Sequence, residues 1–362
     1  MDGVDAVLCD FSERPPVIPA CRTLPFGPEP RRMLDQLRAD PDRFPTADLA
    51  RIDALLGDVF AAAAQVVCAA AGLSATDITA IGSHGQTVLH RPEACPPHTL
   101  QIGDPNRIAS ATGVLTVADF RRADLAAGGQ GAPLAPLLHK ALMASTEENR
   151  VVVNLGGIAN ISVLPARGGV TGFDTGPANC LLDFWYRHHH GGDFDRNGTW
   201  AASGRADAEW LARLMQDTYF QRPPPKSTGI EYFSPAWLRA RLPKWADQRP
   251  ADIQATLVEF SVAGICESID LLPAHDRPER VIVCGGGVHN DYLMRRLADQ
   301  LAPHGVVSSA DMGLDPDQVE AILFAWLARE RLAGRALATP QITGAVAPVL
   351  AGTICAPPVS RR

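Results

Sequence analysis

Several features of common protein classes are missing from the 362-residue sequence. The longest apolar run near the N-terminus is Ala6 to Cys9, far below the roughly 20 residues that a membrane-spanning helix needs, and no basic segment precedes it. The formal net charge is −7, and Lys and Arg form no cluster, so neither nucleic acid nor a membrane is expected as a partner. We expect a cytoplasmic protein.

Cysteine pairs and two catalytic motifs are missing as well. The eight cysteines include no C-x-x-C pair, which excludes the usual zinc sites and a disulfide framework and predicts reduced thiols. No G-x-x-x-x-G-K-[ST] motif occurs, and the residues around Ser83 do not form a G-x-S-x-G nucleophile elbow. P-loop nucleotide hydrolases and serine hydrolases are therefore excluded.

The apolar fraction of 46% is enough for a sizeable core, and the length suggests about two domains. Short apolar runs that end in glycine turns alternate with longer helical segments, a pattern typical of an α/β fold. We expect strands over residues 5–11, 78–83, 99–102, 115–118, 151–155, 160–164, 170–174 and 280–284. We expect helices over residues 31–38, 46–71, 133–145, 180–188, 206–219, 250–272, 290–301 and 315–333.

A Gly- and Pro-rich segment, residues 126–136, indicates the crossing between domains. We therefore predict a first domain of residues 1–124 plus about 338–362 and a second of residues 125–337. A weak internal symmetry supports two similar halves, because "VDAVLCDF" in the first and "NISVLP" in the second each follow a glycine turn. In the second half a strand also precedes that turn, whereas the first half has none.

The first glycine motif is "NLGGIANIS", residues 154–162. Its paired glycines, Gly156 and Gly157, would let backbone N–H groups approach an anion. Taken alone, however, such a short motif favours an ordinary hairpin turn.

The second glycine motif is "VIVCGGGVHN", residues 281–290, in which a buried strand leads through Gly285, Gly286 and Gly287 into a helix. Unpaired N–H groups at such a helix start can bind phosphate. A dinucleotide-binding fingerprint would need a third glycine where Asn290 stands. We prefer nucleotide binding to a purely structural turn.

The third motif, "GFDTGPAN", places Asp174 at the carboxyl end of a strand, where open α/β sheets bind ligands. A carboxylate there can act as a general base or hold a magnesium ion, but it can also cap the following helix. His84, His90 and His98 lack the spacing of a zinc site, and substrate contact is the better role for His84. Lys226 in "PPPKSTG" could reach a phosphate or be an exposed loop lysine.

The strongest signal is the order of seven motifs that cover nearly the whole chain: "SHGQTVLHRP", "LQIGDP", "ADFRRADLAAGGQGAPLAP", "VVVNLGGIANISVLP", "GFDTGPAN", "PPPKSTGIEYF" and "VIVCGGGVHN". Together they resemble the anhydro-N-acetylmuramic acid kinase family of the sugar kinase and actin superfamily. This resemblance implies two actin-like ATPase domains with the ribonuclease H-like fold, which close on ATP and Mg²⁺ in a deep cleft.

The resemblance also implies an activity and its residues. Asp174 would be the general base that activates water against the anomeric carbon, while O6 leaves the anhydro bridge and takes the γ-phosphoryl group. The product would be N-acetylmuramic acid 6-phosphate, in peptidoglycan recycling. His84, Gln86, Arg121 and Glu320 would contact the sugar. The nucleotide and its phosphates would be bound by Asp2, Gly3, Asp5, Asn154, Gly156, Gly157, Gly285, Gly286 and Gly287.

The resemblance departs from the family pattern at the N-terminus. Members carry a strand and then a loop resembling G-T-S-M-D-G-V-D, and the sequence given starts at the methionine of that loop. Asp2, Gly3 and Asp5 match it. Because the preceding strand would be central in the first sheet, we expect its neighbours to keep unpaired backbone groups.

Two other functions stay open at this point. One is another sugar kinase of the superfamily, acting on an ordinary hydroxyl or on a carboxylate. The other is a truncated nucleotide-binding pseudo-kinase without activity. The sequence also leaves a homodimer open.

Overall fold

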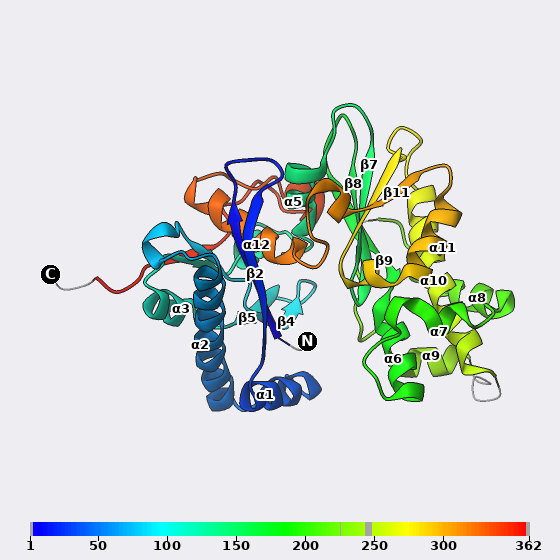
Figure 1. Cartoon of the computed structure of the whole chain (residues 1–362), viewed down its shortest axis with the longest axis horizontal. Helices are drawn as coiled ribbons and strands as arrows, with labels where there is room; N and C mark the ends of the chain where they lie inside the picture. The colour runs from blue at the N-terminus through cyan, green and yellow to red at the C-terminus, as the bar shows by residue number, and fades with distance from the viewer. Residues whose placement is uncertain (1–2, 225, 243–247, 360–362) are drawn as a thin grey trace. The chain divides into compact units, whose positions relative to one another are not determined.

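The computed structural model describes residues 3–224, 226–242 and 248–359, and it divides into two compact units (Figure 1). Unit 1 comprises Met1–Leu138 and Glu320–Arg362, and unit 2 comprises His139–Val319. The predicted boundaries, after residues 124 and 337, differ from these. Of the predicted site residues, Asp2 lies outside the described part.

Unit 2 is built on one five-stranded sheet in the order β11-β10-β7-β8-β9. The strands are β7 (Arg150–Leu155), β8 (Ile158–Leu164), β9 (Thr171–Pro177), β10 (Arg280–Cys284) and β11 (Gly305–Ser308). β8 runs antiparallel to both of its neighbours, whereas β7, β10 and β11 are mutually parallel. From β9 to β11 the chain order is therefore 3-2-1-4-5, as expected for a ribonuclease H-like domain.

The centre of this sheet is apolar because β7 has a hydrogen-bonded strand on each side and packing on both faces. Val151, Val152 and Val153 are fully buried. Val151 and Val153 face the main core with residues of α10 (Pro250–Asp270), most of whose residues are buried. Gly264 lets α10 lie against β9, because a Cβ there would come within 3.0 Å of the Thr175 carbonyl oxygen.

The other helices of unit 2 cover this sheet or lie in the segment between α6 and α10. They are α6 (Asn179–His190), α7 (Thr199–Ala202), α8 (Ala208–Met215), α9 (Pro235–Arg241) and α11 (Asp291–Leu301). Helix α5 (Ala135–Met143) contains the division between the units.

Unit 1 carries its strands in three separate sheets. β1 (Gly3–Asp10) pairs with β2 (Val17–Pro25), and β4 (Gln86–Arg91) pairs with β5 (His98–Ile102). The third sheet has the order β12-β6-β3, formed by Thr353–Cys355, Thr116–Ala118 and Ile81–Gly82. The helices are α1 (Pro28–Ala39), α2 (Thr46–Ala70), α3 (Pro105–Thr112), α4 (Arg122–Ala126), α12 (Val319–Leu332) and α13 (Pro340–Thr343).

Helix α2 is the one helix among the described residues that is long and apolar enough to cross a membrane. It packs within unit 1 against α1, α3, β1 and β2. Two of its carboxylates have specific partners, since Asp53 accepts from the Gly103 N–H and Asp58 pairs with Arg107. Length and composition alone are weak evidence for a spanning helix, and these contacts are those of a packed one.

The α/β fold class is confirmed, and every predicted strand and helix has a counterpart, although several are shorter. The bounds of β10 agree with the prediction. The strands that were not predicted are β2, β4, β11 and β12. β2 contains Pro19 and ends at Pro25, residues that argue against a strand except at an edge, and β12 is too short to give a periodic signal.

Candidate active site

The two glycine turns lie side by side in unit 2. β7 and β10 are parallel neighbours whose last paired residues are Asn154 and Cys284. The turns that follow, Gly156-Gly157 and Gly285-Gly286-Gly287, therefore lie next to each other at the carboxyl ends of these two strands. Among the described residues nothing accepts a hydrogen bond from the N–H of Gly156, Gly157 or Gly286. These donors are available to an anion.

The three glycines after β10 are needed for different reasons. Gly285 has φ 83°, and a Cβ there would meet the Asn154 side chain, while a Cβ on Gly287 would lie 2.5 Å from Leu155 Cβ. Both are required by packing. A Cβ on Gly286 would meet nothing within 4 Å, so the protein's own packing leaves room above this residue for a ligand.

Asp174 lies on β9, at the edge of the same sheet. Its Oδ2 accepts a hydrogen bond from the Thr228 N–H at 2.9 Å, and its carbonyl oxygen accepts from the Tyr219 hydroxyl at 2.6 Å. Burial raises the pKa of the Asp174 carboxyl to about 6, and the bond from Thr228 opposes that rise. A carboxyl with this pKa is well suited to accept a proton near neutral pH. Helix capping, the alternative interpretation, is not what Asp174 does.

A row of polar residues crosses the sheet beside Asp174. Asn154 pairs with Asn160, and Asn160 pairs with Asp174. Residues directly opposite each other on neighbouring strands point to the same face, so these three side chains share one face. The sequence analysis did not select Asn160. The available signal was a polar residue inside a mostly apolar strand, "IANISVL".

Lys226 is neither the phosphate-binding nor the exposed loop lysine considered from the sequence. It is buried, with 8% of its surface exposed. Its ammonium group donates to the carbonyl oxygens of Tyr219 and Phe220 and lies 4.9 Å from the centre of the Tyr219 ring. These contacts hold the segment before Thr228 in place.

A second cluster of predicted residues lies in unit 1 around Arg121. The Arg121 guanidinium donates to His84 Nε2 at 2.9 Å and to the Gly131 carbonyl at 2.9 Å. Burial and the charge of Arg121 lower the pKa of His84 to about 3, so its ring is neutral. The ring also stacks on Phe324 of α12, at 4.3 Å between centroids. Asp124 fixes the loop that contains Gly131, because its carboxylate accepts a hydrogen bond from the Gly131 N–H.

Two predicted carboxylates adjoin this cluster. The Glu320 residue is partly open to solvent, but the protein around its carboxyl group desolvates that group and raises its pKa. The positive charge of Arg121 opposes this rise in pKa, and the negative charge of Asp5 adds to it. Asp5 accepts a hydrogen bond from Thr23 across the β1–β2 pair. The structure thus brings His84, Arg121, Glu320 and Asp5 together in unit 1.

The other predicted residues of unit 1 are less directly connected. Gln86 is buried, and its amide donates to the carbonyl oxygen of the next residue. Gly3 packs closely on β2, since a Cβ there would lie 2.3 Å from the Leu24 carbonyl oxygen. His90 bonds to Thr99 and His98 to the Pro96 carbonyl. No group of three or more metal-binding side chains occurs among the described residues.

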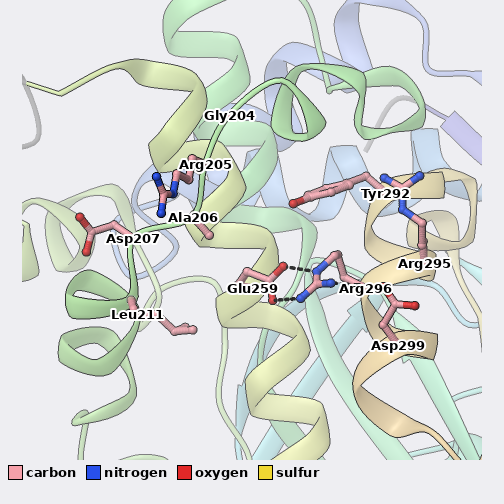
Figure 2. A pocket seen from close by; sticks show the side chains of 11 residues that line it. Gly204, Arg205, Ala206, Asp207, Leu211, Glu259, Tyr292, Arg295, Arg296 and Asp299 are labelled. Carbon is pink, nitrogen blue, oxygen red and sulfur yellow. Dashed lines mark hydrogen bonds and ion pairs between the residues drawn. The ribbon is translucent and has the colours of Figure 1, made fainter.

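One surface cavity of unit 2, of about 520 Å³, lies along α11 and the start of α8 (Figure 2). The Glu259–Arg296 ion pair lies within it, and Tyr292 and Arg295 line one side. None of the predicted site residues lines this cavity.

The comparisons with known proteins show the family of the chain. The family model "Anhydro-N-acetylmuramic acid kinase" matches residues 1–357. The chain belongs to the anhydro-N-acetylmuramic acid kinase family. A curated kinase of this name from Xanthomonas campestris pv. campestris is 49% identical over 356 residues, which is 98% of this chain and 94% of that protein. The kinase from Xylella fastidiosa is 46% identical over 357 residues, 98% of this chain and 93% of that protein.

Solved structures are more distant from this member of the anhydro-N-acetylmuramic acid kinase family. A ROK family glucokinase from Streptomyces griseus, in complex with glucose and AMPPNP, has a TM-score of 0.40 and 13% identity, covering 90% of this chain and 100% of that one. The activator of a 2-hydroxyisocaproyl-CoA dehydratase from Clostridium difficile, with bound ADPNP, has a TM-score of 0.38 and 12% identity, covering 88% of each chain. Scores this low carry no argument about function.

Proposed function

We propose that this protein is an ATP-dependent kinase that opens 1,6-anhydro-N-acetylmuramic acid with water and phosphorylates O6. The product is N-acetylmuramic acid 6-phosphate, and the setting is cytoplasmic recycling of peptidoglycan. Membership of the kinase family supports the reaction. The observation that carries it is Asp174, a desolvated carboxylate on the sheet whose glycine turns offer free N–H groups.

The reaction needs a base, and we propose Asp174 for this role. Its carboxylate takes a proton from a water molecule, whose oxygen attacks the anomeric carbon. The bond from that carbon to O6 breaks, and the electron pair on O6 attacks the γ-phosphorus of ATP, releasing ADP. No nucleophilic Ser or Cys is required, since phosphoryl transfer depends mainly on positioning and charge stabilisation.

The nucleotide enters as MgATP. We propose that the N–H groups of Gly156, Gly157 and Gly286 face its phosphates, with Asp5 and Gly3 contributing from unit 1. The metal neutralises charge on the phosphate oxygens and, as magnesium usually does, keeps much of its shell as water and phosphate oxygen.

In this proposal the sugar is bound by the cluster around Arg121 in unit 1. We propose that Arg121 binds it or stabilises charge in the transition state, and that His84 orients the guanidinium. His84 is suited to this role because it is neutral and accepts from Arg121. Gln86 and Glu320 are proposed as further contacts.

The test is a coupled ADP-release assay with the anhydro sugar, simple hexoses and acetate as acceptors. We expect turnover with the anhydro sugar, and ³¹P NMR should show a phosphomonoester at O6. Turnover with glucose or acetate instead would favour another kinase of the superfamily, and ATP binding without transfer to any acceptor would favour a pseudo-kinase.

A further inference from the structure

Three hydrogen bonds hold Asp174 from the outer side of β9. β9 is an edge strand, and the segment Lys226–Thr228 lies beside it. The Asp174 N–H donates to the Lys226 carbonyl at 3.1 Å, and the Thr228 N–H donates to Asp174 Oδ2 at 2.9 Å. The Tyr219 hydroxyl donates to the Asp174 carbonyl oxygen at 2.6 Å. Both backbone groups and one carboxylate oxygen are therefore occupied.

The two carboxylate oxygens of Asp174 differ in their hydrogen bonding. Oδ2 is bonded to Thr228, while Oδ1 has no hydrogen-bond partner among the residues that the structure describes. A single bond of this kind fixes the rotation of the carboxylate and so determines which oxygen faces outward.

The holding segment is itself anchored. Lys226 is buried, and its ammonium group donates to two carbonyl oxygens in the turn that contains Tyr219. Tyr219 has only 1% of its surface exposed. Burial lowers the pKa of Lys226, and the negative charge of Glu267 on α10 opposes this shift. The segment is therefore a fixed part of unit 2 and not a free loop.

We propose that Lys226–Thr228 is a positioning element for the reaction, in which the Thr228 N–H holds Oδ2 of Asp174 and leaves Oδ1 to take the proton from water. This inference rests on the proposed function. Thr228 acts through its main chain, so its side chain is not the source of the effect.

The same bond affects the charge of the base. Burial raises the pKa of Asp174 to about 6 and the Thr228 N–H lowers it, so removing the donor leaves burial unopposed and the pKa rises further. Since only the deprotonated base is active, the acid limb of kcat/KM would move to higher pH. Among the titratable groups of this segment, Tyr219 interacts with the charge of Asp174, and Lys226 interacts with the charges of Glu267 and Arg222.

The experiment compares Thr228→Pro, which removes the N–H, with Thr228→Ala, which keeps it. We expect the proline variant to shift the acid limb upward by about one pH unit, with kcat at pH 6 reduced several-fold and the KM for ATP unchanged. The alanine variant should keep the wild-type midpoint. An unshifted limb in folded Thr228→Pro, or an equal shift in both variants, would overturn the proposal.

Two further measurements distinguish failure of this proposal from misfolding of Thr228→Pro and from failure of the proposed function. If Thr228→Pro does not fold, Lys226→Met, which removes the anchor and keeps the volume, should shift the limb in the same direction; an unshifted limb would count against the proposal. Titration of the Asp174 carboxyl by ¹³C NMR, assigned with Asp174→Asn, reads the pKa without turnover. It tests the positioning even if the anhydro sugar is not the substrate, whereas failure of the acceptor assay would overturn only the proposed function.

Discussion

The two units differ in how their strands are joined, since unit 2 has one five-stranded sheet and the strands of unit 1 lie in three separate sheets. In unit 2 the hairpin β8–β9 and the parallel pair β10–β11 lie on either side of β7. In unit 1 the hairpin β1–β2 and the parallel pair β3–β6 are present, but among the described residues no strand joins them. The valines of β7 are fully buried, whereas β1, which is also largely apolar, has no buried residue. Burial of these strands therefore goes with pairing on both sides, which β7 has and β1 does not have among the described residues.

The comparison extends to the site. The internal symmetry relates β1 to β8, because "VDAVLCDF" and "NISVLP" each follow a glycine turn. In β8, Asn160 lies between Asn154 and Asp174, whereas Asp5 of β1 pairs with Thr23 on one side and, among the described residues, with no strand on the other. Unit 2 thus carries Asp174 and the glycine turns on one continuous sheet, and unit 1 carries the cluster around Arg121.

The largest expected effect tests whether Asp174 is the base. Asp174→Asn keeps the shape but cannot take a proton, so kcat should fall by about two orders of magnitude or more while ATP binding stays nearly intact. The matched control is Asp183→Asn on α6, because burial raises the pKa of Asp183 to about 6 as well. Rate assays and calorimetry check both. Near wild-type turnover in Asp174→Asn, or an equal loss in Asp183→Asn, would contradict the assignment.

The pH dependence of the reaction follows from the same group. Because the pKa of Asp174 is raised to about 6, the carboxyl is protonated and inactive below that pH and becomes active above it. At pH 5, kcat/KM should be roughly tenfold below its plateau. Histidine is not expected to contribute to this limb, since His84 is already neutral. A rate that is flat between pH 5 and 7 would exclude Asp174 as the titrating base.

The glycines after β10 separate binding from folding. A side chain on Gly286 meets no protein atom within 4 Å, so Gly286→Val should fold normally and weaken ATP binding by about tenfold, because it fills space that the nucleotide needs. Gly287→Val should instead destabilise the protein by roughly 1–3 kcal/mol, because its Cβ overlaps Leu155. Calorimetry with ATP and thermal melting distinguish the two. Unchanged ATP affinity in folded Gly286→Val would refute the nucleotide site.

The smallest expected effect concerns the separate sheets of unit 1. Among the described residues, β1 and β3 each have one edge without a partner strand, so an apolar strand and a loop of about ten to fifteen residues, added at the N-terminus, should pair with them. We expect the thermal midpoint to rise by a few degrees and turnover to increase. An extension of equal length with prolines at alternate positions is the control, since it cannot pair. Equal stability and equal rate with and without the strand would show that β1 needs no such partner.

Much of unit 2 could be predicted because its signals are local. Runs such as "VIVC" end in glycine turns. Asp174 was selected as a carboxylate at a strand end, but β9 continues to Pro177, so Asp174 lies within the strand. Asn160 was missed because cross-strand register depends on pairing between distant segments. Thr228 was missed because a main-chain donor has no residue signature. Lys226 was misjudged because its burial depends on Tyr219 and α10, and Glu320 was found through the family resemblance, not through its helical pattern.

The central claim is that the chain opens and phosphorylates an anhydro amino sugar with Asp174 as its base. The most direct measurement is ATP-dependent phosphorylation of 1,6-anhydro-N-acetylmuramic acid, followed by ³¹P NMR, with wild-type protein and Asp174→Asn side by side. The account predicts a phosphomonoester at O6 with the wild type and almost none with the variant. The same product formed at the same rate by both proteins, or no transfer to this sugar while a simple hexose is phosphorylated, would contradict it.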